Sequence, residues 1–148
     1  IKEKLIMSRV ARSARVGSRQ RPEAVASSKT ITAAESGEVY IVSGSAAITL
    51  TLPSPQEGSY YKFIYDNGMT QNMKVAAQDG DLFIGFTKQI VGAAGESITV
   101  AAANGSSNDA LTLAGGASAG SYIECFSDGT VWYVDGMATG SAYSFGNS

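Results

Sequence analysis

The chain has 148 residues and a formal net charge of -2, and it contains no histidine and one cysteine. A chain of this length predicts one domain, and the lack of histidine excludes Ser-His-Asp and Cys-His catalytic sites. One cysteine excludes an intrachain disulfide and a common Cys/His zinc site. Since no apolar run is long enough to cross a bilayer, we expect no membrane contact. We also expect no cofactor.

The charge is divided unevenly along the chain. Residues 1–30 hold eight basic and two acidic side chains, a balance of +6, whereas the remainder holds three basic and eleven acidic ones, a balance of -8. We therefore predict a basic arm over residues 1–28 ahead of an acidic body. The arm residues expected to bind a partner are Arg9, Arg12, Arg15, Arg19 and Arg21.

The arm can be interpreted in two ways. The first four of these arginines recur at three or four residues, so a helix would place them on one stripe. The arm is then either a solvated tail or a segment that becomes ordered on a negatively charged partner surface. Because no aromatic residue lies between the arginines to stack on bases, we favour a protein surface and expect no nucleic-acid partner.

The body, over residues 29–137, reads as a series of short strands. Apolar residues alternate with polar ones, as where Ile48, Leu50 and Leu52 alternate with threonines. Turn residues separate the strands at intervals of about ten residues, which favours a compact antiparallel β-sandwich or barrel, an all-β fold. The predicted strands are KTITA, EVYIVS, AAITLTLP, YYKFIYD, NMKVAA, DLFIGF, KQIVGA, ESITVAA, DALTLAG, SYIECFS and TVWYVDG.

Aromatic residues gather in the strand YYKFIYD. Tyr61, Phe63 and Tyr65 share one strand face under the period of two. Such a face is found on carbohydrate-binding surfaces, but a core edge or a subunit contact is more common. We therefore assign these three residues as candidates for a subunit interface.

The stretch SDGTVWYVDG holds the only tryptophan of the chain. Asp128 and Gly129 predict a turn that pairs this strand with SYIECFS as a hairpin. Trp132 then lies on one face and Tyr133 on the other, so both faces are apolar and both are expected to be covered. One cover is the core and the other is a neighbouring subunit, which makes Trp132 and Tyr133 further interface candidates.

Two remaining segments give weaker signals. Cys125, in a strand-like run, is expected to pack as a small hydrophobic residue. The tail over residues 138–148 is rich in Gly and Ser and carries Tyr143 and Phe145, so it either lies on a neighbouring subunit or is a frayed end.

Carboxylates offer little sign of chemistry. Asp79 and Asp81 flank a glycine, which is ordinary turn chemistry rather than an EF-hand loop, so no metal site is predicted. The glutamates are scattered, and no spacing pairs two of them for glycoside hydrolysis. We therefore predict no catalytic residues and a protein that is not an enzyme, although two carboxylates converging in a cleft would favour a small hydrolase.

The succession of these strands resembles small β-rich structural modules of tailed-bacteriophage virions. The resemblance spans residues 35–137 and is carried by the strand ending in LPSP, the strand YYKFIY after a glycine, and the closing GSYIECFSDGTVWYVDG. Such modules occur in capsid decoration (cement) proteins, head fibres, tail fibres and receptor-binding proteins, and they typically assemble as trimers. The resemblance does not cover the basic arm.

Taken with the small size of the chain, the resemblance implies a decoration protein on the capsid surface of a virion. We expect it to bind and stabilise the shell without catalysis, with the major capsid protein as its partner and the basic arm as its tether. A homotrimer is expected, and three arms would strengthen a weak contact through effective concentration. The alternative is a tail-fibre or adhesin module that binds a host surface glycan through exposed aromatic residues.

Overall fold

The structure is a computed structural model that describes residues 21–92 and 96–148. Seven strands form the first sheet: β1 (Glu23–Val25), β3 (Val39–Val42), β5 (Tyr60–Tyr65), β7 (Phe83–Val91), β8 (Ser97–Asn104), β10 (Tyr122–Ser127) and β11 (Trp132–Thr139). Five form the second: β2 (Lys29–Thr30), β4 (Ile48–Thr51), β6 (Met73–Ala76), β9 (Ala110–Leu113) and β12 (Tyr143–Gly146). One short 3-10 turn, η1 (Ala33–Glu35), precedes β3.

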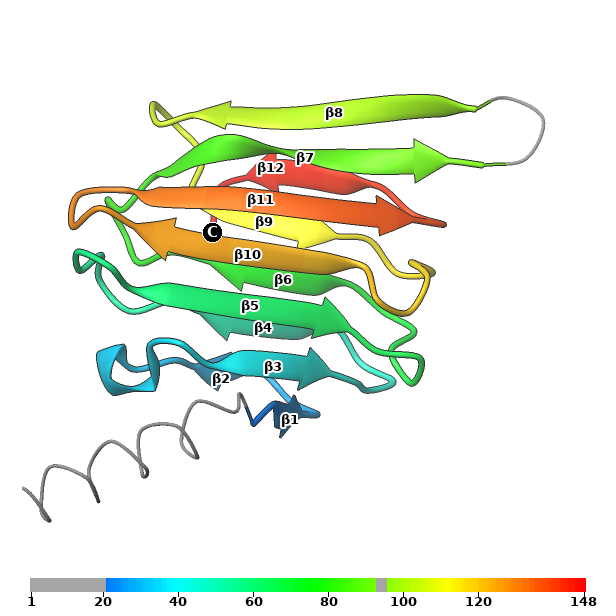
Figure 1. Cartoon of the computed structure of the whole chain (residues 1–148), viewed down its shortest axis with the longest axis horizontal. Helices are drawn as coiled ribbons and strands as arrows, with labels where there is room; N and C mark the ends of the chain where they lie inside the picture. The colour runs from blue at the N-terminus through cyan, green and yellow to red at the C-terminus, as the bar shows by residue number, and fades with distance from the viewer. Residues whose placement is uncertain (1–20, 93–95) are drawn as a thin grey trace, which may run out of the picture.

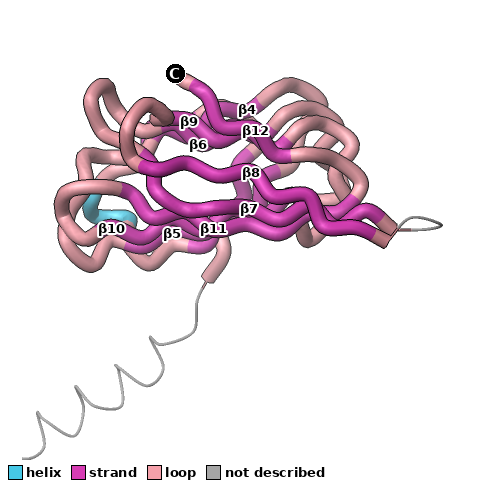
Figure 2. Tube along the Cα trace, turned by 90° about the horizontal axis from the view of Figure 1, so that it is seen from above, coloured by secondary structure: helices cyan, strands magenta, loops and turns pink. Residues whose placement is uncertain are grey.

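The two sheets face each other as a sandwich (Figures 1 and 2). The first has the order β1-β3-β5-β10-β11-β7-β8 and the second the order β12-β9-β6-β4-β2. The predicted all-β sandwich is confirmed. In the part of the chain that is described, no helix has the length and apolar character needed to cross a membrane.

The sheets are mixed, whereas the sequence predicted antiparallel pairing. Strands β1, β3 and β5 are parallel neighbours in the first sheet, and β2, β4 and β6 are parallel neighbours in the second. The reason is that the chain alternates between the sheets over its first six strands, so it returns to each sheet in the same direction. The β10–β11 hairpin is antiparallel, as predicted.

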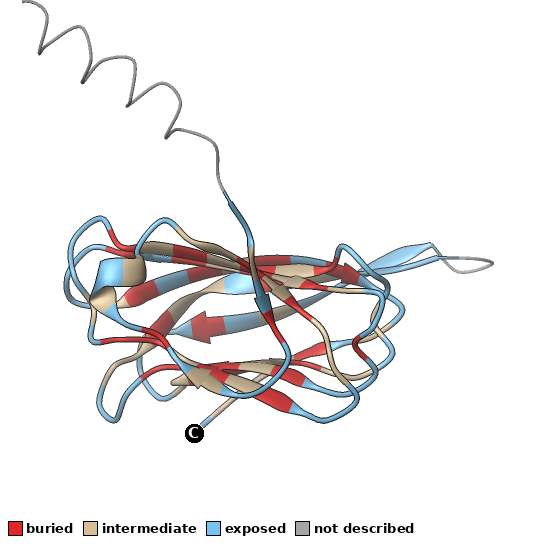
Figure 3. Cartoon of the chain, turned by 90° about the horizontal axis from the view of Figure 1, so that it is seen from below, coloured by how far each residue is buried: buried red, intermediate tan, exposed pale blue. Residues whose placement is uncertain are grey.

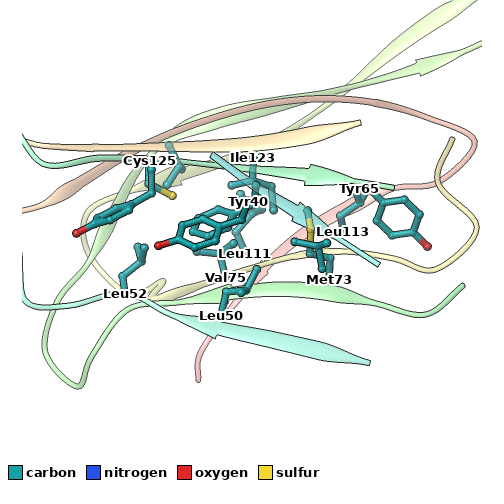
Figure 4. Close-up of a cluster of buried hydrophobic side chains, with 14 of the residues drawn as sticks. Tyr40, Leu50, Leu52, Tyr65, Met73, Val75, Leu111, Leu113, Ile123 and Cys125 are labelled. Atoms are coloured by element: carbon teal, nitrogen blue, oxygen red, sulfur yellow. The ribbon is translucent and has the colours of Figure 1, made fainter. Parts of the chain in front are cut away.

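The core lies between the sheets and follows the alternation seen in the sequence. Ile48 and Leu50 are buried, while Thr49 and Thr51 between and after them point outward and are half-buried. Side chains from both sheets meet in the cluster of Figure 4. Its labelled members are Tyr40, Leu50, Leu52, Tyr65, Met73, Val75, Leu111, Leu113, Ile123 and Cys125.

Four of the five predicted interface residues belong to this core. The side chains of Trp132, Tyr61, Phe63 and Tyr65 are all 0% exposed, and the rings of Trp132 and Tyr61 lie 5.8 Å apart. A second subunit therefore cannot contact them, and their assignment to an interface is wrong. The predicted alternation within β5 and β11 is correct, but the face that carries Tyr61, Phe63 and Tyr65, and the face that carries Trp132, point into the core and not toward a partner.

The strands predicted as DLFIGF and KQIVGA form one continuous strand, β7. It pairs with β8 in a hairpin that extends beyond the body of the sandwich (Figures 1 and 3). At Gly85 the backbone has φ 142°, and a Cβ there would collide with the carbonyl oxygen of Val134 on β11. Glycine thus lets the strand pass without a break, because only glycine accepts both this φ and this close approach.

Both terminal segments contribute strands to the body. Strand β1 lies within the predicted arm, yet it pairs with β3, and Val25 joins the core. Strand β12 lies within the predicted tail and pairs with β9, and the buried Tyr143 donates its hydroxyl to the carbonyl oxygen of Tyr122 at 2.5 Å. This tail is therefore an ordered edge strand of the second sheet rather than a frayed end.

One ion-pair network ties the N-terminal strands together. The Lys29 ammonium lies 2.5 Å from a carboxylate oxygen of Glu23 on β1 and 2.5 Å from one of Glu35 in η1. Hydrogen bonds to these two carboxylates raise the pKa of Lys29. Burial alone would raise the pKa of Glu35, but the hydrogen bonds from Lys29 and Thr32 outweigh it and hold that pKa below 4.5.

Replacing Lys29 by Met is expected to lower the free energy of unfolding by about 0.5–1 kcal/mol at pH 7, because the network is partly exposed. The lowered pKa of Glu35 gives stability that is present above its unfolded pKa and is lost as pH falls through its folded value. Urea denaturation from pH 3 to 7 should thus show a flatter acid limb for Lys29→Met. The control Lys74→Met, at a lysine with no ion pair among the described residues, should leave that limb unchanged.

Candidate interaction surface

The two outer faces of the sandwich differ in character. The second sheet presents polar side chains to solvent, among them Thr49, Thr51, Lys74 and Thr112. The first sheet instead exposes large apolar side chains. We call this set the outer apolar face, and its members are Phe86, Ile90, Ile98, Val100, Phe126, Tyr133 and Met137.

Strand register explains why these side chains lie together. On β10 and β11, Phe126 is directly opposite Tyr133. On β7 and β8, Ile90 is opposite Ile98, and β7 runs beside β11. Because alternate residues of a strand share a face, the seven side chains lie on one face across four neighbouring strands, with Asp135 and Lys88 among them. Scattered apolar residues are normal on a protein surface, but a contiguous patch marks an interaction site.

The turn between β10 and β11 fixes the position of Tyr133. Asp128 accepts hydrogen bonds from the backbone N–H groups of Thr130 and Val131 and from the Tyr133 hydroxyl. The two backbone hydrogen bonds lower the pKa of Asp128, and the resulting carboxylate charge raises the pKa of Tyr133. The Asp-Gly turn therefore holds an exposed aromatic ring in one orientation on the outer apolar face.

A row of charges crosses this face. Glu124 lies directly opposite Asp135 on the β10–β11 hairpin and opposite Lys62 on β5. The Lys62 ammonium is 3.1 Å from a Glu124 carboxylate oxygen, and it also lies 4.5 Å from the ring centre of Tyr122. Among the described residues Asp135 makes no ion pair, so the row carries one negative charge without a close positive partner.

Two shallow grooves lie on this face. One, of about 150 Å³, is lined by Tyr60, Glu124, Cys125, Phe126, Tyr133, Val134 and Asp135. The other, of about 250 Å³, is lined by Ile90, Tyr122, Met137 and Thr139 together with residues 119–121 and Ala138. Burial and the charge of Glu124 raise the pKa of Tyr60. The first groove thus combines aromatic rings with a pair of carboxylates, which is the pair that sequence spacing did not predict.

The hairpin of β7 and β8 carries the most exposed apolar residues of the set. Ile98 is 64% exposed and Val100 is 57% exposed, and both lie on β8, the edge strand of the first sheet. Strand β8, SITVAAAN, has no charged residue and no proline. Edge strands of monomeric proteins are commonly protected by such residues, so this edge has the character of a surface covered by a partner.

The predicted site residues now divide into three groups. Arg9, Arg12, Arg15 and Arg19 lie outside the described residues, and Arg21 is exposed at the start of the described chain. Tyr133 is 42% exposed on the outer apolar face, where an interface residue can act. The other four interface candidates are in the core.

Sequence reasoning missed most of the outer apolar face. A signal was present in FIGFTKQIV, because Ile84, Phe86 and Ile90 share one parity while Phe83 has the other. A strand with apolar residues of both parities is covered on both faces. Because DLFIGF and KQIVGA are predicted as two separate strands, the apolar residues on both faces of the single strand β7 are not recognised from the sequence.

Cys125 is fully buried, as predicted, and burial raises the pKa of its thiol. Because the thiolate is the reactive form, we expect the native protein to react with a thiol reagent at pH 8 only as fast as it unfolds. The same chain in denaturant should react within seconds to minutes. Equal rates in the two conditions would contradict the buried position of Cys125.

Two comparisons with known proteins found no relative of this chain. No model of a known protein family matches the chain, and no curated protein matches it. Among the described residues, no three Cys, Asp or Glu side chains gather as a potential metal-binding group. The chemistry of the surface therefore has to be argued from its own residues.

Proposed function

We propose that this chain is a non-enzymatic structural protein of a phage virion, a decoration or cement protein that binds the capsid surface and stabilises the shell. The observation that carries the proposal is the outer apolar face of the first sheet, which is an extended surface for association. Its grooves are shallow, and nothing among the described residues surrounds a substrate. The resemblance of residues 35–137 to virion modules supplies the biological context.

The proposed mechanism is binding alone. The chain forms a homotrimer through the outer apolar face, and each copy presents a basic arm to the major capsid protein. Burying the apolar face removes it from water, which favours association by about 25 cal/mol per Å² before the costs of ordering are counted. Three arms on one trimer raise the effective concentration of each arm at the shell.

The assembly part of the proposal has a direct test. The purified full chain is expected to have the mass of a trimer in light scattering at micromolar concentration, and to co-sediment with capsids that lack it. A chain that is monomeric at all concentrations and does not co-sediment would contradict the proposal.

A second candidate function, host-glycan binding by a tail-fibre or adhesin module, is favoured by the smaller groove. Carbohydrate-binding sites combine aromatic rings with carboxylates, and this groove has Tyr60, Tyr133 and Phe126 beside Glu124 and Asp135. This reading predicts that the chain binds host polysaccharide and that Asp135→Asn abolishes the binding.

The decoration proposal predicts neither glycan binding nor hydrolysis. Incubating the chain with host polysaccharide should release no sugar, and Glu124→Gln should change nothing in that assay. Sugar release that is lost in Glu124→Gln would instead identify the two facing carboxylates as catalytic groups.

A further inference from the structure

Strand β8 is a sheet edge without a partner strand on its outer side. Where the β7–β8 hairpin extends past the sandwich (Figures 1 and 3), residues 97–100 of β8 are exposed on both faces. The other edge strands of the two sheets, β1, β2 and β12, have only three, two and four residues. A pair of strands alone is marginally stable in water, and a third strand is needed for independent stability. The projecting part of the hairpin therefore gains from pairing with a further strand.

The register of the hairpin shows which backbone groups can accept that strand. The N–H of Gly105 donates to the carbonyl oxygen of Phe83 at 2.9 Å, and the pairing continues without a break along β7 and β8. In an antiparallel pair, hydrogen-bonded residue pairs alternate with non-hydrogen-bonded ones. The N–H and C=O groups of Ile98 and Val100 therefore point away from β7, to the open edge. The side chains of these two residues are 64% and 57% exposed.

We propose that β8 pairs with β8 of a second copy of the chain, antiparallel and about a twofold axis, with Ile98 directly opposite Ile98 of that copy. Val100 then lies opposite Glu96 of the second copy. The outward backbone groups of both strands meet as donors and acceptors, as in other cases of strand addition at a sheet edge. A twofold contact joins the same surface on both copies. This inference does not rest on the proposed trimer, because it joins any two copies edge to edge.

The charges of the hairpin indicate a second copy as the occupant. Between Phe83 and Asn104 the only charged residues are Lys88 and Glu96, and neither makes an ion pair among the described residues. Within one chain, Lys88 lies opposite Val100, which is four residues from Glu96, or about 13 Å along the strand.

Twofold pairing removes this separation. Glu96 of the second copy lies beside Val100, on the side away from Lys88, so the two charged residues share one row across the interface. About two strand spacings, roughly 10 Å, separate their backbones, a distance that the long side chains of lysine and glutamate can bridge between them. The twofold axis gives the contact two such pairs of opposite charge. A strand from an unrelated protein has no reason to match them.

Charge substitution at the twofold axis tests the register. Ile98→Lys and Ile98→Glu each place two like charges directly opposite one another, which destabilises the pairing. We expect each variant alone to raise the dissociation constant of the contact about tenfold or more. An equimolar mixture should restore the association, because opposite charges then face each other. Light scattering over a dilution series measures association, and circular dichroism confirms that each variant is folded.

A disulfide cross-link provides a second measurement. Ile98→Cys under oxidising conditions should form a linked dimer, because directly opposite residues of an antiparallel pair lie about 5.5 Å apart, within reach of a disulfide. The matched control is Ser144→Cys, at an exposed position on β12 of the second sheet, which should not cross-link. The native Cys125 is fully buried and contributes no cross-link.

Two results would overturn the inference. The first is a mixture of Ile98→Lys and Ile98→Glu that associates no better than either variant alone. The second is an Ile98→Cys chain that cross-links no faster than Ser144→Cys. Neither assay contains a capsid or requires a trimer, so failure here is separate from failure of the proposed function, which the mass of the assembly and co-sedimentation with capsids decide.

Discussion

Replacing Trp132 by Ala is expected to lower the free energy of unfolding by about 3–5 kcal/mol, the usual cost of removing a large buried ring. Trp132 is fully buried, and its ring lies 5.8 Å from that of Tyr61. The sandwich cannot collapse into the space left behind, because strands β10 and β7 hold β11 on both sides. Urea denaturation followed by far-ultraviolet circular dichroism measures the loss.

The neighbouring aromatic residue provides the matched control. Tyr133→Ala changes the next residue of the same strand, but its side chain is on the outer face, so the monomer should lose no more than about 0.5 kcal/mol. Both variants are compared at a concentration at which the chains are monomeric, since assembly would add to apparent stability. Equal losses for the two would contradict the burial of Trp132.

Trp132→Phe separates packing from hydrogen bonding. The indole N–H of Trp132 has no hydrogen-bond partner among the described residues. Phenylalanine removes this unsatisfied donor while keeping most of the ring, so the expected loss is only about 1–2 kcal/mol.

Deleting residues 1–20 is expected to weaken capsid binding by about a hundredfold or more while the sandwich remains folded. The deletion removes four of the five arginines of the proposed tether, and with them the effective-concentration gain of three arms per trimer. Sequence alone placed the end of the arm at residue 28, but a deletion to that point would also remove β1, so the shorter deletion is the cleaner test. Co-sedimentation with capsids and thermal unfolding measure the two properties.

Two sets of substitutions, one that removes the positive charges and one that keeps them, show what the arm recognises. Arg→Gln at Arg9, Arg12, Arg15 and Arg19 should mimic the deletion, whereas Arg→Lys at the same positions should retain most of the binding if charge is what matters. Binding should also weaken as salt is raised, because the contacts are electrostatic. Undiminished binding by the deleted chain would remove the arm from the proposed function, and tight, salt-sensitive binding of the intact chain to DNA would redirect it to nucleic acid.

Local alternation in the sequence predicted a good part of the fold. The parity of Ile48, Leu50 and Leu52, and that of Trp132 against Tyr133, is reproduced in the structure, and so is the hairpin at Asp128. These features depend only on neighbouring residues and on turn chemistry. The pairing of β11 with β7 joins segments distant in the chain, and no local pattern specifies it.

The candidate surface was harder to predict for a physical reason. A period of two shows which side chains share a face, but not which face is inside. In YYKFIY the three aromatic residues that share a face are predicted to form a subunit contact, yet Tyr61, Phe63 and Tyr65 fill the core. On β7, β10 and β11 the exposed apolar residues lie on strands that carry apolar residues on both faces, and only the position of the second sheet decides which face is inside.

The two edges of the first sheet are far apart on the molecule. Strand β1, next to the proposed tether, is at one edge and β8 is at the other, with five strands between them. At about 4.8 Å per strand spacing, roughly 29 Å separates them. The proposed tether thus lies at the β1 edge, and the exposed apolar side chains of β8 lie at the opposite edge. Detaching the proposed trimer from the capsid would require the tethers of three subunits, spaced widely apart, to be released together.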